Sequence, residues 1–523
     1  MTMLRVELHN QAPRLGNRQF ARNLAASLLS LAAGFAASLC LPPFLIRTMG
    51  VAAYGLVPLA SSLVAYLSLL TITLNSATGR FVTIAIARGE HERAQRIFST
   101  SLSGALIIGA GLLAIGVAGA PHVVKLFAVP PGYAADARRL VLYAVLCLII
   151  STVTAVFSVS MYYANRLDAS SGINIMRQLT YLAAAVLFVR FVAARPQVVG
   201  LALLIGVLVA FGLTVYAWRR YTPWLRVSPV LDRSILRELT GYGAWVIINQ
   251  VGALLFLSID LLIVNRLLGA VSGGQYGALL QWPTVIRSLG GAMSAVFAPT
   301  MAHLYADGNI DALVTYCRRA IRLVGALTSL PVALLCGLAV PFLRLWLGAE
   351  FVPLAPLLIL LIGYLTIDIA VTPLLNLQQT VQAVKVPGIM TCVMGVVKLG
   401  AAVLLVAGFG GGMQSVAAAG AVVLTLHQGG FTTVYGAWIL RQRWHTFIVP
   451  LLPIVLVCAS TAGAGYAWTL HRPIAGWGQL ITAGVVLSGI YILACWCFVL
   501  ARTERGLLLS RLRTLSPGVP CQK

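Results

Sequence analysis

The sequence is divided into about fourteen apolar runs, each long enough to cross a bilayer as a helix, because roughly 20 such residues span the hydrocarbon core. Only short polar segments separate these runs. Backbone groups in lipid must bond internally, and continuous apolar runs satisfy this as helices. We therefore predict an all-α polytopic membrane protein of about 14 transmembrane helices, at residues 20–46, 54–78, 97–119, 140–163, 173–193, 197–217, 241–265, 277–299, 323–345, 354–378, 388–408, 414–437, 447–468 and 476–500.

The charges support a bilayer as the partner and exclude nucleic acid. The chain is 59% hydrophobic and only 10% charged, with a formal net charge of +24. In a soluble protein this charge would suggest nucleic acid, but here the cations lie in clusters between apolar runs, as in loops that face an anionic leaflet. Loops on the side of the amino terminus hold most of them, including Arg88, Arg93, Arg219, Arg220 and Arg318. The positive-inside rule therefore predicts that both termini are cytoplasmic.

An internal repeat predicts two lobes. Segments 47–50, 88–90 and 125–127 correspond to 266–269, 307–309 and 344–346, all at one offset of 219 residues. Six helices separate the copies, so both have the same orientation in the membrane and form a parallel repeat around a central cavity. The predicted parts are a cytoplasmic tail at 1–19, an N-lobe at 20–217, a cytoplasmic linker at 218–240, a C-lobe at 241–437, two accessory helices within 447–500 and a cytoplasmic tail at 501–523.

Motifs for catalysis or cofactors are missing from the sequence. There is no Gly-rich run ending in Gly-Lys-Ser/Thr, so no phosphate-binding ATPase loop is predicted. No Cys or His spacing suggests a metal site, and no Ser, His and Asp set suggests a hydrolase. The polar loops are also too short to form a catalytic domain. We predict no catalytic residue, no metal and no cofactor; transport energy would come from an ion gradient or from substrate supply, and the chain would not be an enzyme.

Four charged residues stand at membrane depth: Asp260, Arg287, Asp368 and Lys398. Charges there cost several kcal/mol unless they are paired or face a cavity. Asp368 and Lys398 should lie at one depth, while Asp260 and Arg287 lie on consecutive helices about one turn apart. One interpretation is two structural ion pairs. The other is a cationic cavity in which Arg287 and Lys398 bind a diphosphate and Asp260 or Asp368 couples transport to an ion.

Neutral polar residues and one terminal arginine are further candidates for substrate binding. Asn75, Asn249 and Gln250 lie within or near apolar runs, where they could bind sugar hydroxyls or bond between helices. Arg80 closes the second run at the predicted cytoplasmic rim, where it could guide an anionic head group or extend its charged end to the interface.

Several short motifs resemble one transporter family. They are 50–56 (GVAAYGL), 80–81 (RF), 88–93 (RGEHER), 258–260 (SID) and 346–351 (WLGAEF). The pattern is similar to the polysaccharide transporter branch, Wzx-type O-antigen and exopolysaccharide flippases, of the multidrug, oligosaccharidyl-lipid and polysaccharide (MOP) exporter superfamily.

The resemblance implies two six-helix bundles in a V shape, as in multidrug and toxin exporters, which alternate between inward-open and outward-open states. Such a protein carries an undecaprenyl-diphosphate-linked oligosaccharide across a bacterial inner membrane for polysaccharide synthesis. Polysaccharide polymerase and other assembly proteins are candidate partners. The alternatives are a cation-exporting multidrug transporter of the same fold and a lipid II flippase. The expected mid-helix cations fall in the C-lobe only, which would disfavour a strongly acidic glycan.

Overall fold

The computed structural model describes residues 17–228, 231–500 and 505. Every regular element in these ranges is a helix. They contain 11 helices that are long and apolar enough to cross a membrane, or 12 if the bent pair Gln250–Leu257 and Ile259–Leu268 is one span. The predicted all-α polytopic class is confirmed, but the predicted number of fourteen spans is not.

Two of the predicted runs are irregular helices, and the break in the first accounts for part of this difference. In the run at 277–299, helix α13 (Gln281–Ala295) ends before α14 (Ala298–Ala306), where Pro299 stands in the first turn. In the run at 414–437, α21 (Met413–Thr425) passes through a π-helical segment, Leu426–Thr432, into α22 (Thr433–Ile439). Proline removes a backbone donor and π-turns widen the helix, so an unbroken apolar run need not form an unbroken helix.

The chain forms two compact units. Of the described residues, the first unit comprises 17–49, 63–125, 131–228 and 231–247; the second comprises 50–62, 126–130, 248–500 and 505. The first is built from α2 (Asn17–Met49), α5 (Leu69–Ala87), α6 (His91–Leu126), α7 (Ala134–Tyr163), α8 (Leu167–Phe191), α9 (Pro196–Tyr221) and the start of α10 (Arg233–Leu257).

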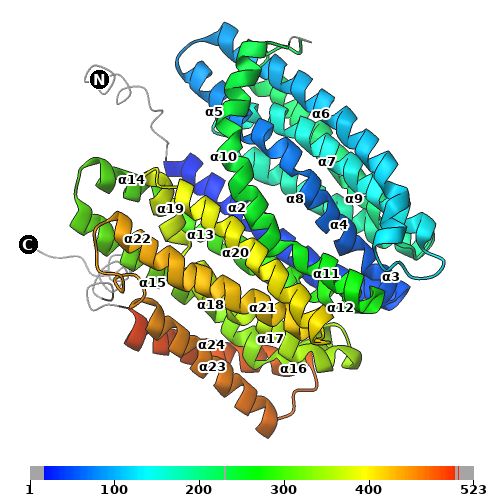
Figure 1. Cartoon of the computed structure of the whole chain (residues 1–523), viewed down its shortest axis with the longest axis vertical. Helices are drawn as coiled ribbons and strands as arrows, with labels where there is room; N and C mark the ends of the chain where they lie inside the picture. Colours follow the sequence, from blue (N-terminus) through cyan, green and yellow to red (C-terminus); the bar gives the residue numbers. More distant parts are fainter. Residues whose placement is uncertain (1–16, 229–230, 501–504, 506–523) are drawn as a thin grey trace, which may run out of the picture. The chain divides into compact units, whose positions relative to one another are not determined.

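Within the first unit, α9 packs along both α7 and α8, and α2 packs along α8 (Figure 1). The core is aromatic where α6, α7 and α9 meet: Phe157 contacts Phe98 and Trp218 edge-on, and Phe98 stacks on Trp218. Gly206 on α9 allows close packing, because a Cβ there would lie 2.9 Å from the backbone oxygen of Arg177 on α8. Small and aromatic residues thus fix the spacing of this bundle.

The residue before α10 acts as its cap. Asp232 Oδ1 accepts hydrogen bonds from the Ser234 backbone at 2.9 Å and from the Ser234 hydroxyl at 2.6 Å. These bonds stabilise the charged carboxylate and lower the pKa of Asp232. Helix α10 therefore has a defined start directly after the polar segment that precedes it.

The second unit contains the end of α10 and the remaining helices, most of them short; the helix Leu56–Leu67 belongs to it only as far as Ser62. They are α3 (Val51–Tyr54), α4 (Leu56–Leu67), α11 (Ile259–Leu268), α12 (Ala270–Leu279), α13, α14, α15 (Ile310–Gly337), α16 (Ala339–Trp346), a 3-10 turn (Ala349–Leu354), α17 (Ala355–Gly363), α18 (Leu365–Ala370), α19 (Thr372–Thr380), α20 (Lys385–Val403), α21, α22, α23 (Leu451–His471) and α24 (Trp477–Ala494). Further π-helical segments occur at Leu404–Gly408 and Cys495–Val499.

The last two helices, α23 and α24, pack on α15, orange and red against green in Figure 1. Gly337 on α15 permits this contact, because a Cβ there would lie 2.7 Å from the Ala462 carbonyl oxygen. The Tyr491 hydroxyl donates to the Ala326 carbonyl at 2.7 Å. The predicted accessory helices are therefore bound firmly to the second unit.

The sequence repeat is visible in the backbone. Gly50 and Gly269 have φ angles of 83° and 93°, and each precedes a short helix, α3 or α12. Gly89 and Gly308 have φ angles of 74° and 70°, and each lies between two helices. Positive φ strongly favours glycine. The matched sequence positions therefore mark matched turns in the two copies.

Candidate functional site

The four predicted intramembrane charges form two ion pairs within the second unit. Arg287 on α13 contacts Asp368 on α18: its Nε and Nη2 lie 3.0 and 2.9 Å from Asp368 Oδ2. Arg287 Nη2 also donates to the Tyr364 hydroxyl at 3.0 Å, and the guanidinium lies 5.4 Å from the centre of the Tyr364 ring. The Nη1 amino group of Arg287 takes part in none of the bonds described, so this arginine keeps donors for a further acceptor.

The other pair is more deeply buried. Lys398 on α20 is 1% exposed, and its ammonium lies 2.8 and 2.9 Å from the two carboxylate oxygens of Asp260 on α11. It also donates to the Phe256 carbonyl, and the Tyr276 hydroxyl donates to Asp260 Oδ2 at 3.2 Å. Hydrogen bonding of this kind offsets the cost of burying both charges.

The partners in the two ion pairs differ from those suggested by the membrane depths that we estimated from the sequence. Asp368 and Lys398 were expected at one depth and Asp260 beside Arg287, but the structure pairs Lys398 with Asp260 and Arg287 with Asp368. Helix breaks are the reason, because α10 and α11 meet at a 42° bend and Asp368 lies on the six-residue helix α18. Depth counted along a straight helix does not hold across such breaks.

A cavity of about 310 Å³ in the second unit is lined by the Arg287 pair. Polar side chains on its wall include Gln378, Gln379, His427 and Gln428. Three helix breaks border it: the end of α10, the junction of α18 and α19, and the π-helical segment Leu426–Thr432. Lys398 and Asp260 do not line it. The cavity therefore combines one cation that has free donors with several amide and imidazole groups.

The first unit contains a separate cavity of about 230 Å³ between α7, α8 and α9. Arg177 lines it together with Asn174 and the hydroxyls of Ser151, Thr154, Ser158, Ser170 and Thr214, and none of the described lining residues is Asp or Glu. Helix α8 starts at Leu167, so Arg177 lies about 15 Å along its axis. The predicted run began at 173, which placed this arginine near a membrane surface. The expectation that mid-helix cations occur only in the C-lobe is therefore wrong.

The comparisons with known proteins agree with this architecture. A family model described as "Polysaccharide biosynthesis protein" matches residues 44–356. The uncharacterized membrane protein EpsK of Bacillus subtilis (strain 168) is 34% identical over 509 residues, which are 96% of this chain and 98% of that protein. The chain belongs to this polysaccharide biosynthesis family.

Solved structures show that the fold is that of the MOP superfamily. The lipid II flippase MurJ in an inward closed conformation has a TM-score of 0.69 at 12% identity, covering 93% of this chain and 99% of that chain. A multidrug resistance MATE family transporter in an inward-facing conformation has a TM-score of 0.61 at 16% identity, covering 80% and 94%. The chain is thus a multi-pass membrane protein of the polysaccharide biosynthesis family, and it has the fold that the sequence resemblance implied.

The remaining predicted binding residues of this polysaccharide biosynthesis protein lie elsewhere. Asn75 on α5 is half-buried, and its Oδ1 has no hydrogen-bond partner in the described part of the chain. Arg80 is exposed near the end of the same helix. Gln250 on α10 is half-buried, and the side chain of Asn249 lies outside the described residues. Asn75, Arg80 and Gln250 do not belong to the lining of the 310 Å³ cavity. Their substrate-binding roles stay predictions.

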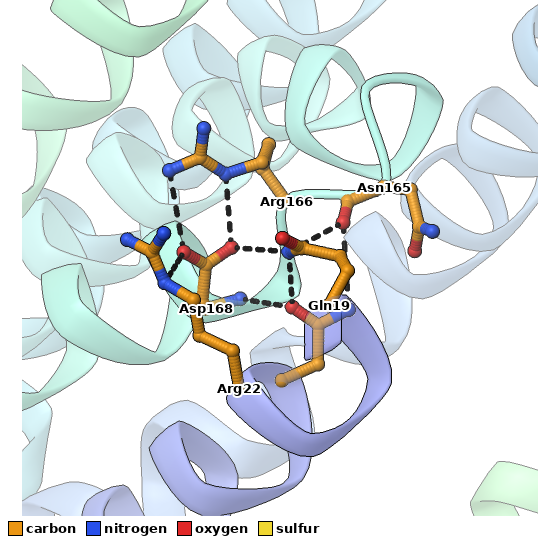
Figure 2. A network of polar contacts seen from close by, with 6 residues as sticks. Gln19, Arg22, Asn165, Arg166 and Asp168 are labelled. Atoms are coloured by element: carbon orange, nitrogen blue, oxygen red, sulfur yellow. Dashed lines mark hydrogen bonds and ion pairs between the residues drawn. The ribbon is translucent and has the colours of Figure 1, made fainter. Parts of the chain in front are cut away.

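A polar cluster joins the starts of α2 and α8 in the first unit of the protein. Figure 2 shows the Asp168 carboxylate between Arg166, at 3.0 Å, and Arg22, at 2.8 Å, while Gln19 donates to it at 3.1 Å. The same Gln19 donates to the carbonyl of Asn165, which has a φ of 52°. Asp168 also lies in the first turn of α8, where a negative charge is favourable. This cluster fixes where α8 begins, and therefore how deep Arg177 lies.

Proposed function

We propose that this polysaccharide transporter is a flippase that moves an undecaprenyl-diphosphate-linked oligosaccharide across a bacterial inner membrane by alternating access, and that it is not an enzyme. The family supports a role in polysaccharide synthesis, and the fold is shared with a flippase and with exporters. The observation that carries the proposal is that Arg287 lines a cavity and that its Nη1 group takes part in none of the hydrogen bonds described for this side chain.

Arg287 suits a diphosphate better than an isolated cation would. Asp368 and Tyr364 hold the guanidinium through Nε and Nη2, so its orientation is set before any ligand binds. Nη1 can then donate two charge-assisted hydrogen bonds to phosphate oxygens. Because Asp368 is already paired, the cavity offers no free carboxylate from this pair to a cationic drug. This disfavours the multidrug alternative.

Arg177, in the first unit, is a second reason to expect an anionic substrate. Thr154, Ser158 and Thr214 donate their hydroxyl protons to carbonyls of their own helices, at 2.7, 2.7 and 2.8 Å. Their oxygens therefore present lone pairs to the cavity, and these accept hydrogen bonds from sugar hydroxyls. Together with Arg177 they suit a hydroxylated group that carries a negative charge. The reason for doubting an acidic glycan, a first lobe without a cation at depth, no longer applies.

The proposal includes the orientation of the protein in the membrane. The excess of Lys and Arg in loops on the amino-terminal side favours cytoplasmic termini. The substrate would then be loaded from the cytoplasmic leaflet, where undecaprenyl-linked units are assembled, and released to a polysaccharide polymerase or another assembly protein on the far side.

The test is a deletion of the gene in its native host, followed by an assay of the sidedness of lipid-linked oligosaccharides. The wild-type gene should restore export, while Arg287→Gln and Arg177→Gln should leave repeat units on the cytoplasmic side. Arg190→Gln is the matched control, because Arg190 is an exposed arginine on the same helix as Arg177. All variants must be present in the membrane at equal amounts.

Three results would contradict the proposal. Full export by Arg287→Gln would show that this guanidinium does not bind the diphosphate. Normal glycan export in the deletion strain, with lost resistance to cationic drugs, would favour the multidrug exporter. Accumulation of lipid II in place of polysaccharide repeat units would favour the lipid II alternative.

A further inference from the structure

The buried Lys398 ammonium has the surroundings of a bound metal cation. Its described contacts are all with oxygen: both carboxylate oxygens of Asp260, at 2.8 and 2.9 Å, and the carbonyl of Phe256. Carboxylates and backbone carbonyls are the ligands that hard cations prefer. Lys398 is 1% exposed, so no water layer separates the charge from these oxygens.

The oxygen ligands are held by elements other than the helix of Lys398. Phe256 lies in the last turn of α10, where carbonyls lack an intrahelical donor, and Asp260 lies in the first turn of α11. The two helices meet at a 42° bend. The Tyr276 hydroxyl on α12 donates to Asp260 Oδ2 and fixes the carboxylate. Interrupted helices of this kind are where membrane transporters bind coupling ions.

The space around the ammonium is also limited by a neighbouring helix. Gly420 on α21 faces it, and a Cβ at Gly420 would lie 3.1 Å from Lys398 Cε and 3.6 Å from Nζ. The ammonium thus occupies a small enclosed volume beside α21. This position is separate from the 310 Å³ cavity, whose lining includes Phe256 but not Lys398 or Asp260.

We propose that Asp260, the Phe256 carbonyl and Tyr276 form a monovalent-cation site that Lys398 fills with its own ammonium. The second unit then carries a covalently attached cation and exchanges no Na⁺ or K⁺ at this site during transport. The inference goes beyond flipping and does not depend on the identity of the glycan. It differs from the ion-coupling role predicted for Asp260 from the sequence, and one experiment separates the two.

The experiment measures the thermal unfolding midpoint of the purified full-length protein in detergent. Sodium, potassium or methylammonium chloride replaces N-methylglucamine chloride at constant ionic strength. The wild type should be insensitive to the cation. Lys398→Ala should have a lower midpoint in N-methylglucamine, and a small cation should raise it in a saturable manner by at least about 3 °C. The double variant Asp260→Asn/Lys398→Ala is the control: without the carboxylate it should show no such dependence.

Several outcomes would overturn the proposal. A saturable Na⁺ or K⁺ effect on the wild type that Asp260→Asn abolishes would show an exchangeable ion at Asp260. Equal responses of Lys398→Ala and the double variant would show that no cation site exists. If Lys398→Ala is not recovered, Lys398→Met, which keeps the length of the apolar chain, is measured in the same salts, and the wild-type titration still distinguishes a filled site from an exchangeable one.

Discussion

Adding one methyl group at Gly290 should separate the two helices that carry the Arg287–Asp368 pair. Gly290 lies on α13, and a Cβ there would be 2.0 Å from Ile369 Cγ2 on α18. Carbon atoms pack at about 3.5–4.0 Å, so the methyl group needs a displacement of roughly 1.5 Å or more. Ile369 is 1% exposed and β-branched, so its side chain has little freedom to rotate away.

The adjacent Gly291 provides the control, because a Cβ at Gly291 has no atom within 4 Å. Both substitutions to alanine gain helix propensity of roughly 0.5–1 kcal/mol. Only Gly290→Ala also loses unfolding free energy through overpacking, typically about 1–3 kcal/mol. The difference between the two variants is therefore the overpacking cost alone, and Gly290→Ala should unfold at the lower temperature.

The assay is thermal unfolding in detergent, combined with the export assay in the deletion strain. Gly290→Ala should lose stability and export, because the shift of α13 against α18 disturbs the Arg287 pair, while Gly291→Ala should retain its stability. Ile369→Ala removes the clashing methyl and should restore part of the loss in the double variant. Equal midpoints for the two glycine variants would refute the contact between α13 and α18.

Two further changes test local contacts. Asp168→Asn removes the charge that faces Arg22 and should cost about 2 kcal/mol in unfolding free energy, between the values for buried and exposed pairs; the exposed Glu92→Gln serves as the control, and an equal midpoint for both would contradict the role of the cluster in fixing α8. Asn309 caps α15, because its Oδ1 accepts a hydrogen bond from the Ala312 backbone at 3.1 Å. Asn309→Ala removes this cap and should lower the free energy of unfolding by about 1 kcal/mol, while Asn309→Asp should keep full stability in the same melting assay.

The parts of the fold that depend on local sequence could be predicted. Apolar runs predict membrane helices because the bilayer imposes the same length requirement on each of them. The repeat could be found because Gly50 and Gly269 occupy backbone conformations that strongly favour glycine, so the sequence signal and the geometry have one cause. The family resemblance rested on motifs near the same turns, and the family match confirmed it.

The parts of the fold that depend on helix rotation and on long-range contacts could not be predicted from the sequence. Which carboxylate meets Lys398 depends on the 42° bend between α10 and α11, and no residue pattern in that run specifies a bend angle. The depth of Arg177 depends on the start of α8. Asp168 sets this start through a contact with Arg22, which lies on a helix distant in the sequence. The apolar run alone begins later, at 173, and therefore hides this arginine.

The π-helical segment Leu426–Thr432 determines which faces α21 and the residues that follow the segment present to their neighbours. Before it, Val423 and Leu424 pack with Phe256; after it, Ala437 and Leu440 belong to a different cluster with Leu374. An α-helix rotates about 100° per residue, and a π-turn accommodates one additional residue. Deleting one residue from the segment would restore regular periodicity but rotate the following helix out of its packing. The number of residues in this segment is therefore constrained independently of their identity.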